Sequence, residues 1–410
     1  MKLKKLFSLI VAIALMLSLT AANACALARK ESKWQQLHNN RSGVMVVAYR
    51  GEASFYPPNS AEAVWSAFEA GADMVSVSVQ KTKDGVLVLC ENENLRNVCN
   101  TSTNHISEIT FEEFKECELY RINGELSGCY PVSLVDILNE DLGDGVLILD
   151  IDKEDKELVY KTVVEERAEE RVILRYKDHS EDIARWIESK KIPLEVMGVY
   201  SGGIIFNTLS HIKRLSAVSS VVQYQSKNYF NVMFESLVTK NYSKDDNARA
   251  AIAMYDPDLC GQRSDTVTGW NEVISKGFSV IESANLSELV SYVERTEYLR
   301  GSLGAALSLA EKADIGACSE VSAANLREAV KKGNEVHRKG IVSEEEFQKA
   351  IAEINLSLIN LNRSEGKETQ KGALNITAGK VIAAVLVGAV LLLAEIYVSK
   401  MQRGKKKKIK

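Results

Sequence analysis

The sequence predicts an α/β fold in which a (β/α)8 barrel of the TIM type precedes a small three-helix bundle and a single transmembrane helix. Three observations support this prediction. Short apolar strands alternate with helical stretches over about 250 residues, the usual length of such a barrel. Amphipathic helices without strands follow, and a long apolar run then precedes a basic tail. The alternation alone would also allow a doubly wound open sheet.

The expected strands are short runs rich in β-branched and other apolar residues. They cover residues 44–50, 74–80, 86–89, 145–152, 171–176, 194–200, 217–224, 250–255 and 279–281. Helical patterns between them cover residues 61–70, 111–117, 134–139 and 271–276.

The second region changes to helical periodicity alone. Three apolar stripes at intervals of three and four residues predict three helices that bury one face each. A capping box, Ser343 to Glu346, marks the start of the last helix. This bundle weakly resembles the "found in various architectures" modules of bacterial surface proteins, which implies a spacer.

The two ends of the chain have the composition of targeting segments. Lysines and an apolar stretch from Leu6 to Leu19 predict a secretory signal peptide. The apolar run from Val381 to Ala394 and the basic tail predict a membrane span with a cytoplasmic C-terminus. The expected segments are 1–28 signal peptide, 43–297 barrel, 298–361 helical module, 362–371 polar linker, 374–399 transmembrane helix and 400–410 basic tail.

This layout predicts a bacterial protein whose N-terminal ectodomain lies outside the cell membrane. The net charge of −4 gives no reason to expect nucleic acid as a partner. Six cysteines remain after removal of the signal peptide, and four of them fall between residues 90 and 129. Outside the cell these would form one or two structural disulfides, with the pairing left open.

Several short motifs in the barrel region have a recognisable order and spacing. They are Tyr49-Arg50-Gly51, Pro57-Pro58-Asn59-Ser60, Gly71-Ala72-Asp73, Ser76-Val77-Ser78, Thr82-Lys83-Asp84-Gly85 and Glu91-Asn92. The series resembles the glycerophosphodiester phosphodiesterase family, which reads His-Arg-Gly, Pro-Glu-Asn-Thr, Gly-Ala-Asp, Glu-x-Asp, Thr-x-Asp-Gly and His-Asp. The resemblance implies a barrel of the phosphodiesterase superfamily and favours it over the open sheet.

The chain departs from the family at the positions that perform the chemistry. Tyr49 and Glu91 stand where the family has its two acid–base histidines, and Ser76 and Ser78 stand where it has two metal-binding carboxylates. Hard divalent cations need anionic oxygen ligands, which hydroxyls do not provide. Tyrosine also titrates too high for an unaided base. We therefore assign no catalytic residue and expect no cofactor.

Other residues retain a capacity to bind. Arg50 and Asn59 match the family, and an arginine at a barrel rim can hold a phosphate through its fork of donors. The predicted ligand-binding set is Arg50, Asn59, Tyr49, Ser76 and Ser78.

Three acids allow a different site. Asp150 and Asp152 are expected on one face of their strand, and with Glu91 they would hold Ca²⁺ or Mg²⁺ in a rearranged metal site. In the simpler interpretation, which we favour, these acids form ion pairs with Arg50 and Arg175.

The predicted function is a membrane-anchored, glycerophosphodiester phosphodiesterase-like protein that binds without catalysis. It would be a pseudoenzyme that takes a phosphodiester, a lipid head group or a cell-wall polymer as ligand. One alternative is an active phosphoric diester hydrolase of lipid or cell-wall metabolism that uses the rearranged metal site. The other is a structural surface stalk.

Overall fold

The computed structural model describes residues 31–39, 42–91, 94–176, 180–200, 219–227, 229–245, 248–316 and 318–361. The chain divides into two compact units between Tyr292 and Val293. The predicted signal peptide, polar linker, membrane span and basic tail lie outside the described residues. Among the helices that are described, none combines the length and apolar character needed to cross a bilayer.

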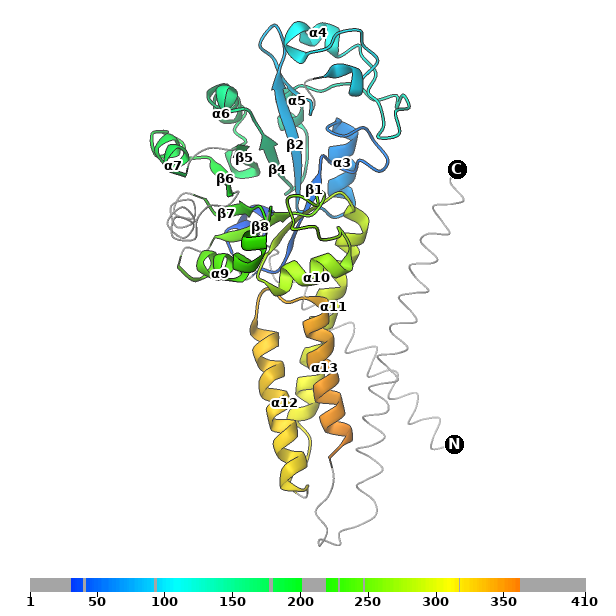
Figure 1. Ribbon diagram of the computed structural model, residues 1–410, viewed down its shortest axis with the longest axis vertical. Helices are drawn as coiled ribbons and strands as arrows, with labels where there is room; N and C mark the ends of the chain where they lie inside the picture. Colours follow the sequence, from blue (N-terminus) through cyan, green and yellow to red (C-terminus); the bar gives the residue numbers. More distant parts are fainter. Residues whose placement is uncertain are drawn as a thin grey trace. The chain divides into compact units, whose positions relative to one another are not determined.

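The first unit contains a closed barrel, which confirms the predicted fold. Within the described residues, eight parallel strands pair in the order β1-β2-β4-β5-β6-β7-β8-β9, and β9 pairs with β1 (Figure 1). Because the ring closes, the doubly wound open sheet does not apply. The barrel strands are β1 (Met45–Tyr49), β2 (Met74–Lys81), β4 (Val146–Asp150), β5 (Val172–Tyr176), β6 (Glu195–Tyr200), β7 (Val221–Tyr224), β8 (Arg249–Ala253) and β9 (Val280–Ser283).

One predicted strand is not part of the barrel. β3 (Leu87–Leu89) pairs antiparallel with the end of β2. Gly85 has φ of 84° between the two strands, and glycine adopts this conformation more readily than other residues. The strand was predicted correctly, but its place in the parallel series was not.

Helices follow most of the barrel strands. Serine side chains accept hydrogen bonds from backbone N–H groups at the start of two of them, Ser60 for α3 and Ser133 for α5. The helices are α2 (Lys33–Leu37), α3 (Ala61–Glu69), α5 (Leu134–Asn139), α6 (Lys156–Glu165), α7 (Ser180–Glu188), α9 (Tyr229–Asp245), α10 (Val267–Ser275) and α11 (Leu286–Glu311), with short 3₁₀ turns η3 (Lys153–Asp155) and η4 (Glu169–Arg171).

The barrel interior is apolar toward the amino-terminal ends of the strands. Alternate residues of the strands point inward, and their side chains form one buried cluster around Met74 and Ile148. The same alternation brings Ser76 and Ser78 to the inside above Met74, as predicted, while Val75, Val77 and Val79 face outward. The interior is therefore a packed floor beneath a polar mouth.

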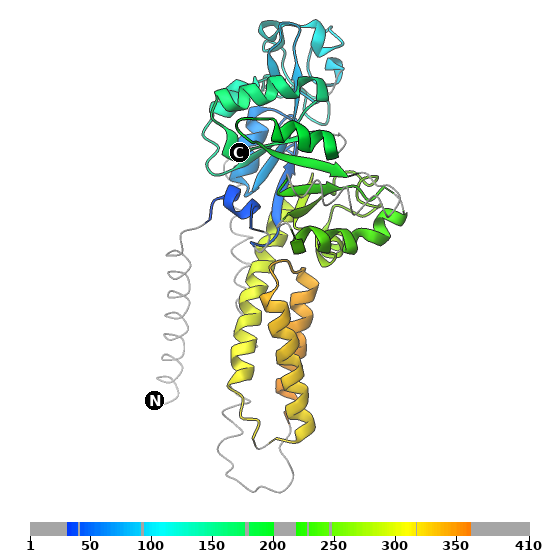
Figure 2. The ribbon, with the colours of Figure 1, turned by 90° about the vertical axis from the view of Figure 1, so that its left-hand side faces the viewer.

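An insertion between β3 and α5 adds a small second core to this unit. It contains η1 (Leu95–Asn97), η2 (Ile106–Glu108) and α4 (Phe111–Phe114). Figures 1 and 2 show it in cyan at one end of the unit. Its apolar side chains pack around Phe114, which is fully buried.

The second unit consists mainly of helices. α11 begins before the division at Tyr292 and continues beyond it, so the predicted barrel end at residue 297 falls inside this helix. α11, α12 (Glu320–Arg338) and α13 (Glu344–Ile359) run side by side and share one hydrophobic core (Figure 2). The predicted capping box of Ser343 and Glu346 starts α13.

Candidate functional site

A cavity of about 970 Å³ opens at the carboxyl ends of the barrel strands. Tyr49, Ser78, Asp150 and Arg175 line it from β1, β2, β4 and β5. Gln223 lines it from β7. Strand ends at this face of a TIM barrel are where ligands and reacting groups gather, so this mouth is the candidate site.

Arg175 occupies the centre of the mouth. Its Nε and Nη2 atoms donate to the two carboxylate oxygens of Asp150, at 2.5 and 2.7 Å. Its Nη1 and Nη2 atoms donate to the carboxylate of Glu282, at 2.6 and 2.9 Å. Burial alone would lower the pKa of Arg175, but these two carboxylates more than reverse the effect and hold its pKa well above the usual value. The guanidinium is therefore a permanent cation bound by two anions.

Tyr49 lies in a stack at the rim. Its ring is parallel to that of Tyr255, with a centroid distance of 3.4 Å and an interplanar angle of 7°. The guanidinium carbon of Arg50 lies 4.1 Å from the Tyr49 centroid on this rim. Burial raises the pKa of Tyr255, which therefore remains a neutral phenol. The rim therefore presents an aromatic surface and one arginine side chain to the cavity.

Arg50 forms an ion pair with Glu91. Both side chains are partly accessible, with 25% and 31% of their surface exposed. Burial lowers the pKa of Arg50 and raises that of Glu91, while their mutual attraction opposes both shifts. The ion pair is thus accessible from solvent. Partial burial disfavours the charged forms of both Arg50 and Glu91.

Asn59, Ser76 and Ser78 connect the first two strands. The Asn59 side-chain oxygen accepts a hydrogen bond from the Ser78 N–H at 2.8 Å, while its amide nitrogen is buried without a partner. The Ser76 hydroxyl donates to the Ala48 carbonyl and accepts from the Arg50 N–H, both at 3.4 Å. Ser76 is fully buried, and these backbone groups engage its hydroxyl.

Arg50 and Asn59 also adopt an uncommon backbone conformation. Their φ angles are 60° and 63°, in the left-handed region that non-glycine residues seldom occupy. The Asn59 N–H donates to the Arg50 carbonyl at 3.1 Å, which fixes the connection between them. Such strain persists where the surrounding contacts determine the conformation and is common at binding sites.

The three predicted acids line the same cavity but do not converge. Glu91 pairs with Arg50, and Asp150 is held by Arg175. Asp152 lies beyond the end of β4, at the N-terminus of η3, so the strand alternation from which we predicted its position does not apply. In the described part of the chain, no group of three or more His, Cys, Asp or Glu side chains could hold a metal ion.

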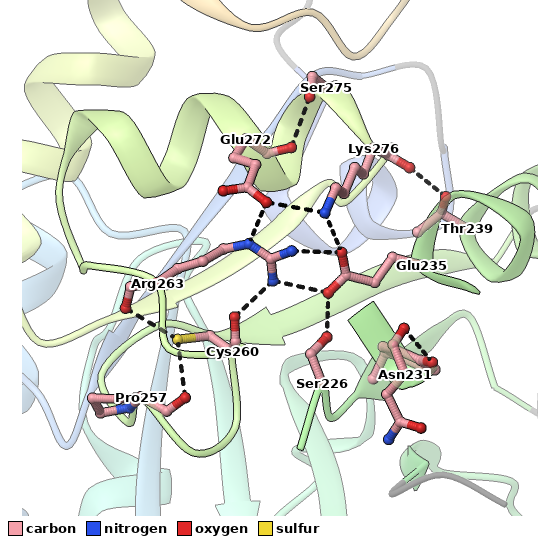
Figure 3. A network of polar contacts seen from close by, with 11 residues as sticks. Ser226, Asn231, Glu235, Thr239, Pro257, Cys260, Arg263, Glu272, Ser275 and Lys276 are labelled. Carbon is pink, nitrogen blue, oxygen red and sulfur yellow. Dashed lines mark hydrogen bonds and ion pairs between the residues drawn. The ribbon is translucent and has the colours of Figure 1, made fainter. Parts of the chain in front are cut away.

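The loops on the far side of the mouth are fixed by a second buried network (Figure 3). Glu235 of α9 accepts two hydrogen bonds from Arg263, at 2.8 and 2.7 Å, and one from Lys276. The Ser226 hydroxyl also donates to Glu235. Arg263 follows the loop after β8, and Ser226 follows β7. These contacts fix the two loops that supply Gln225, Lys227, Asp256 and Asp258 to the cavity wall.

Comparisons with known proteins agree with the barrel fold. The sequence profile of the Glycerophosphoryl diester phosphodiesterase family matches residues 50–180. A glycerophosphodiester phosphodiesterase of Caldanaerobacter subterraneus is 29% identical over 143 residues, which are 33% of this chain and 58% of the relative. A glycerophosphoryl diester phosphodiesterase structure from Parabacteroides distasonis superposes with a TM-score of 0.52 at 17% identity, covering 60% of this chain and 85% of that one.

Residues 50–180 thus match this family's profile, and the barrel resembles a glycerophosphoryl diester phosphodiesterase barrel in its fold. The chain spans 58% of the length of the curated relative that it matches. The family match therefore concerns residues 50–180, and the structural likeness shows the fold alone.

The residues of this barrel do not fit the divalent metal that the family resemblance implies. Ser76 and Ser78 provide neutral hydroxyls at two ligand positions, and the Ser76 hydroxyl is already hydrogen-bonded to backbone groups. Asp150, which matches the third metal-ligand position of the resembled family, has both carboxylate oxygens engaged by Arg175. A cation placed among these groups would compete with a fixed guanidinium and gain little negative charge. We therefore derive no step through a metal.

The sequence interpretation expected ion pairs of the acids with Arg50 and Arg175 but did not include Glu282 or Tyr255. Glu282 lies on β9, two positions after the inward-facing Val280, so strand alternation could have indicated it. His38 and His105 do not line the cavity, whereas His179 and His211 lie outside the described residues.

Proposed function

We propose that the barrel binds a phosphodiester or another anionic head group at its mouth and does not hydrolyse it. The observation that supports this most strongly is the clamp of Arg175 on Asp150 and Glu282. Asp150, a candidate metal ligand, pairs with a resident arginine instead. Hydrolysis of a phosphodiester needs stabilisation of developing negative charge, which a metal commonly supplies.

Binding of an anionic head group requires a cavity and a cationic donor but no metal, and the mouth supplies both. A cavity of about 970 Å³ is large enough for a head group. Arg50 is accessible at its rim, and Glu91 is the anion that now pairs with it. A phosphate that replaced Glu91 would keep the Arg50 charge paired and gain a bidentate hydrogen bond. Ligand binding is thus an exchange of one anion for another.

The test uses the full chain with a soluble glycerophosphodiester such as glycerophosphoglycerol. Calorimetry measures binding, and a coupled enzymatic assay measures released glycerol phosphate, each with and without a chelator. We expect binding that Arg50→Met abolishes and no release under either condition. The exposed Arg327→Met is the matched control for loss of an arginine.

Two outcomes would contradict the proposal in different ways. Metal-dependent release that Asp150→Asn or Glu91→Gln abolishes would establish a phosphoric diester hydrolase with a rearranged site. Absence of binding to glycerophosphodiesters, lipid head groups and cell-wall polymers would leave the barrel as a structural stalk.

We also propose that the chain is exported and held in the cell membrane of a bacterium. The apolar run at 374–399 and the basic tail at 400–410 support this proposal, together with the N-terminal signal pattern. Protease added to intact cells should remove the barrel and spare a tag after Lys410. Recovery of the intact chain from the soluble fraction would contradict the proposed anchor.

A further inference from the structure

The insertion between β3 and α5 gathers cysteines in its core. Cys90, Cys99 and Cys129 are buried in the same apolar cluster, and the partly buried Cys117 packs against it. None of the six cysteines in the described part of the chain is joined in a disulfide in this structure. The sequence left the pairing of these residues open, and their positions now discriminate between the alternatives.

The backbone brings the segments of Cys99 and Cys117 together. Cys99 and Leu119 form an antiparallel bridge. The Asn100 N–H donates to the Glu118 carbonyl at 3.0 Å, and the Tyr120 N–H donates to the Val98 carbonyl at 2.8 Å. Hydrogen bonds on both sides of the bridge make Cys99 and Leu119 a non-hydrogen-bonded pair, whose Cα atoms approach to about 4.5 Å with side chains on one face.

Cys117 lies two residues before Leu119, diagonally across from Cys99. Cys117 itself lies in a bend, so its position relative to Cys99 depends on its own contacts rather than on a ladder register. The turn after α4 keeps Cys117 in place, because its N–H donates to the Phe114 carbonyl at 2.9 Å. The Cys117 thiol donates to the Glu113 carbonyl at 3.4 Å, and its interaction with the Cys99 thiol contributes, after burial, to the raised pKa of Cys99.

We propose that Cys99 and Cys117 form a disulfide that closes the insertion. The other two cysteines of the cluster are less well placed. Cys129 interacts with Glu62 and Ser127 rather than with a thiol. Cys90 approaches Cys99 as well, but it ends β3, where its N–H donates to the Ser78 carbonyl. This inference does not depend on the proposed ligand of the barrel.

The accessibility of the two thiols sets the order of the reaction with a small-molecule disulfide oxidant. Cys117 is partly exposed, whereas Cys99 is fully buried and burial raises its pKa to about 12. The Cys117 thiolate attacks the oxidant, forms a mixed disulfide and releases one thiol. Cys99 then loses its proton and attacks the Cys117 sulfur, which releases the second thiol. The two cysteines lose two electrons and two protons, and the oxidant is reduced to two thiols.

The bond would restrain the part of the insertion that starts beside the mouth. Cys90 directly precedes Glu91, the partner of Arg50, and the insertion continues from there. A disulfide over residues 99–117 would limit the opening of this segment in the unfolded ensemble. We therefore expect reduction to lower the midpoint of thermal unfolding by about 5 °C or more.

The experiment uses the full chain incubated with oxidised glutathione, alkylated without reduction, digested and mapped by mass spectrometry. We expect a linked peptide pair containing Cys99 and Cys117. Alkylated Cys99 and Cys117 after oxidation, or a Cys90–Cys99 linkage in their place, would overturn the assignment.

The second readout is the change in unfolding midpoint that a reductant causes in each variant. Because each variant is compared with itself, its own starting stability does not affect the result. A reductant should lower the unfolding midpoint of the parent and of the control Cys318→Ser by the same amount. It should leave the midpoint of Cys117→Ser unchanged. A full response to reductant in Cys117→Ser would contradict the proposal, because the stabilising bond would then lie elsewhere.

Discussion

The two ends of the barrel each bury an arginine, but they surround it with different partners. At the floor, Arg249 makes six hydrogen bonds, five to backbone carbonyls and one to the Ser42 hydroxyl. At the mouth, Arg175 is held by the carboxylates of Asp150 and Glu282. At the floor, neutral acceptors bind the Arg249 donors without an anion to balance the positive charge. At the mouth, the two carboxylates accept the Arg175 hydrogen bonds and also balance its charge.

This difference appears in the ionisation of the two groups. Burial lowers the pKa of Arg249 to about 10, with only a distant opposing effect of Asp73. The two carboxylates at the mouth instead hold the pKa of Arg175 above its usual value. The floor thus uses its arginine to close the barrel with α2, while the mouth uses its arginine to neutralise acids. One arginine therefore holds α2 against the barrel end, and the other takes the place that a metal cation would occupy beside the acids.

The largest expected effect lies at the floor. Arg249→Ala would leave the carbonyls of Gln36, Leu37, Asn39 and Gly43 without this donor and leave a cavity where the buried side chain lay. We expect the free energy of unfolding to fall by about 4–5 kcal/mol. Urea unfolding of the variant should be compared with Lys161→Ala, which removes an exposed ion pair. A loss below about 1 kcal/mol would show that the floor does not depend on this residue.

At the mouth, Arg175→Met should be costly for a different reason. It leaves Asp150 and Glu282 as two neighbouring anions without their counter-charge, and we expect a loss of about 3 kcal/mol. The freed carboxylates would also attract a divalent cation. Thermal unfolding with and without calcium should therefore show stabilisation of Arg175→Met and little change in the parent. Equal stabilisation of the parent would indicate that the acids are already available to a cation.

The sequence was sufficient for the barrel and for part of the mouth. Alternation along β2 placed Ser76 and Ser78 inside, and both favoured ion pairs of Arg50 and Arg175 are present. It did not indicate Glu282, which lies 107 residues from Arg175, because closure of the ring decides which strands face one another. It placed β3 in the parallel series because apolar patterning does not specify strand direction.

A moderate effect is expected for the rim, where Glu91 competes with a ligand for Arg50. Glu91→Gln should increase affinity for glycerophosphoglycerol about fivefold, since it removes an anion that binding must displace. Burial raises the pKa of Glu91, so the parent should gain affinity as the pH falls into the range just above the ordinary glutamate value. Calorimetry across this range should show no such gain in Glu91→Gln. The exposed Glu165→Gln is the control.

The smallest effect is expected at the floor, for His38 at the end of α2. His38 has two acceptors: the Trp34 carbonyl lies 2.7 Å from its Nδ1, and the Glu195 carboxylate lies 3.2 Å from its Nε2. A neutral imidazole has one N–H and can serve only one of them, so the charged form is favoured. The hydrogen bond to Glu195 accordingly raises the pKa of His38, although burial opposes the shift.

The sign of the resulting pH dependence follows from this direction. Because the folded pKa exceeds the unfolded value of 6.5, the contribution of His38 is complete below that pH and is lost as the pH rises through the folded pKa. The ring is 39% exposed, so we expect only about 0.5 kcal/mol. Urea unfolding at pH 5.5 and 8.5 should show a decline in the parent that His38→Gln reduces. An identical decline in the variant would assign the pH dependence to other groups.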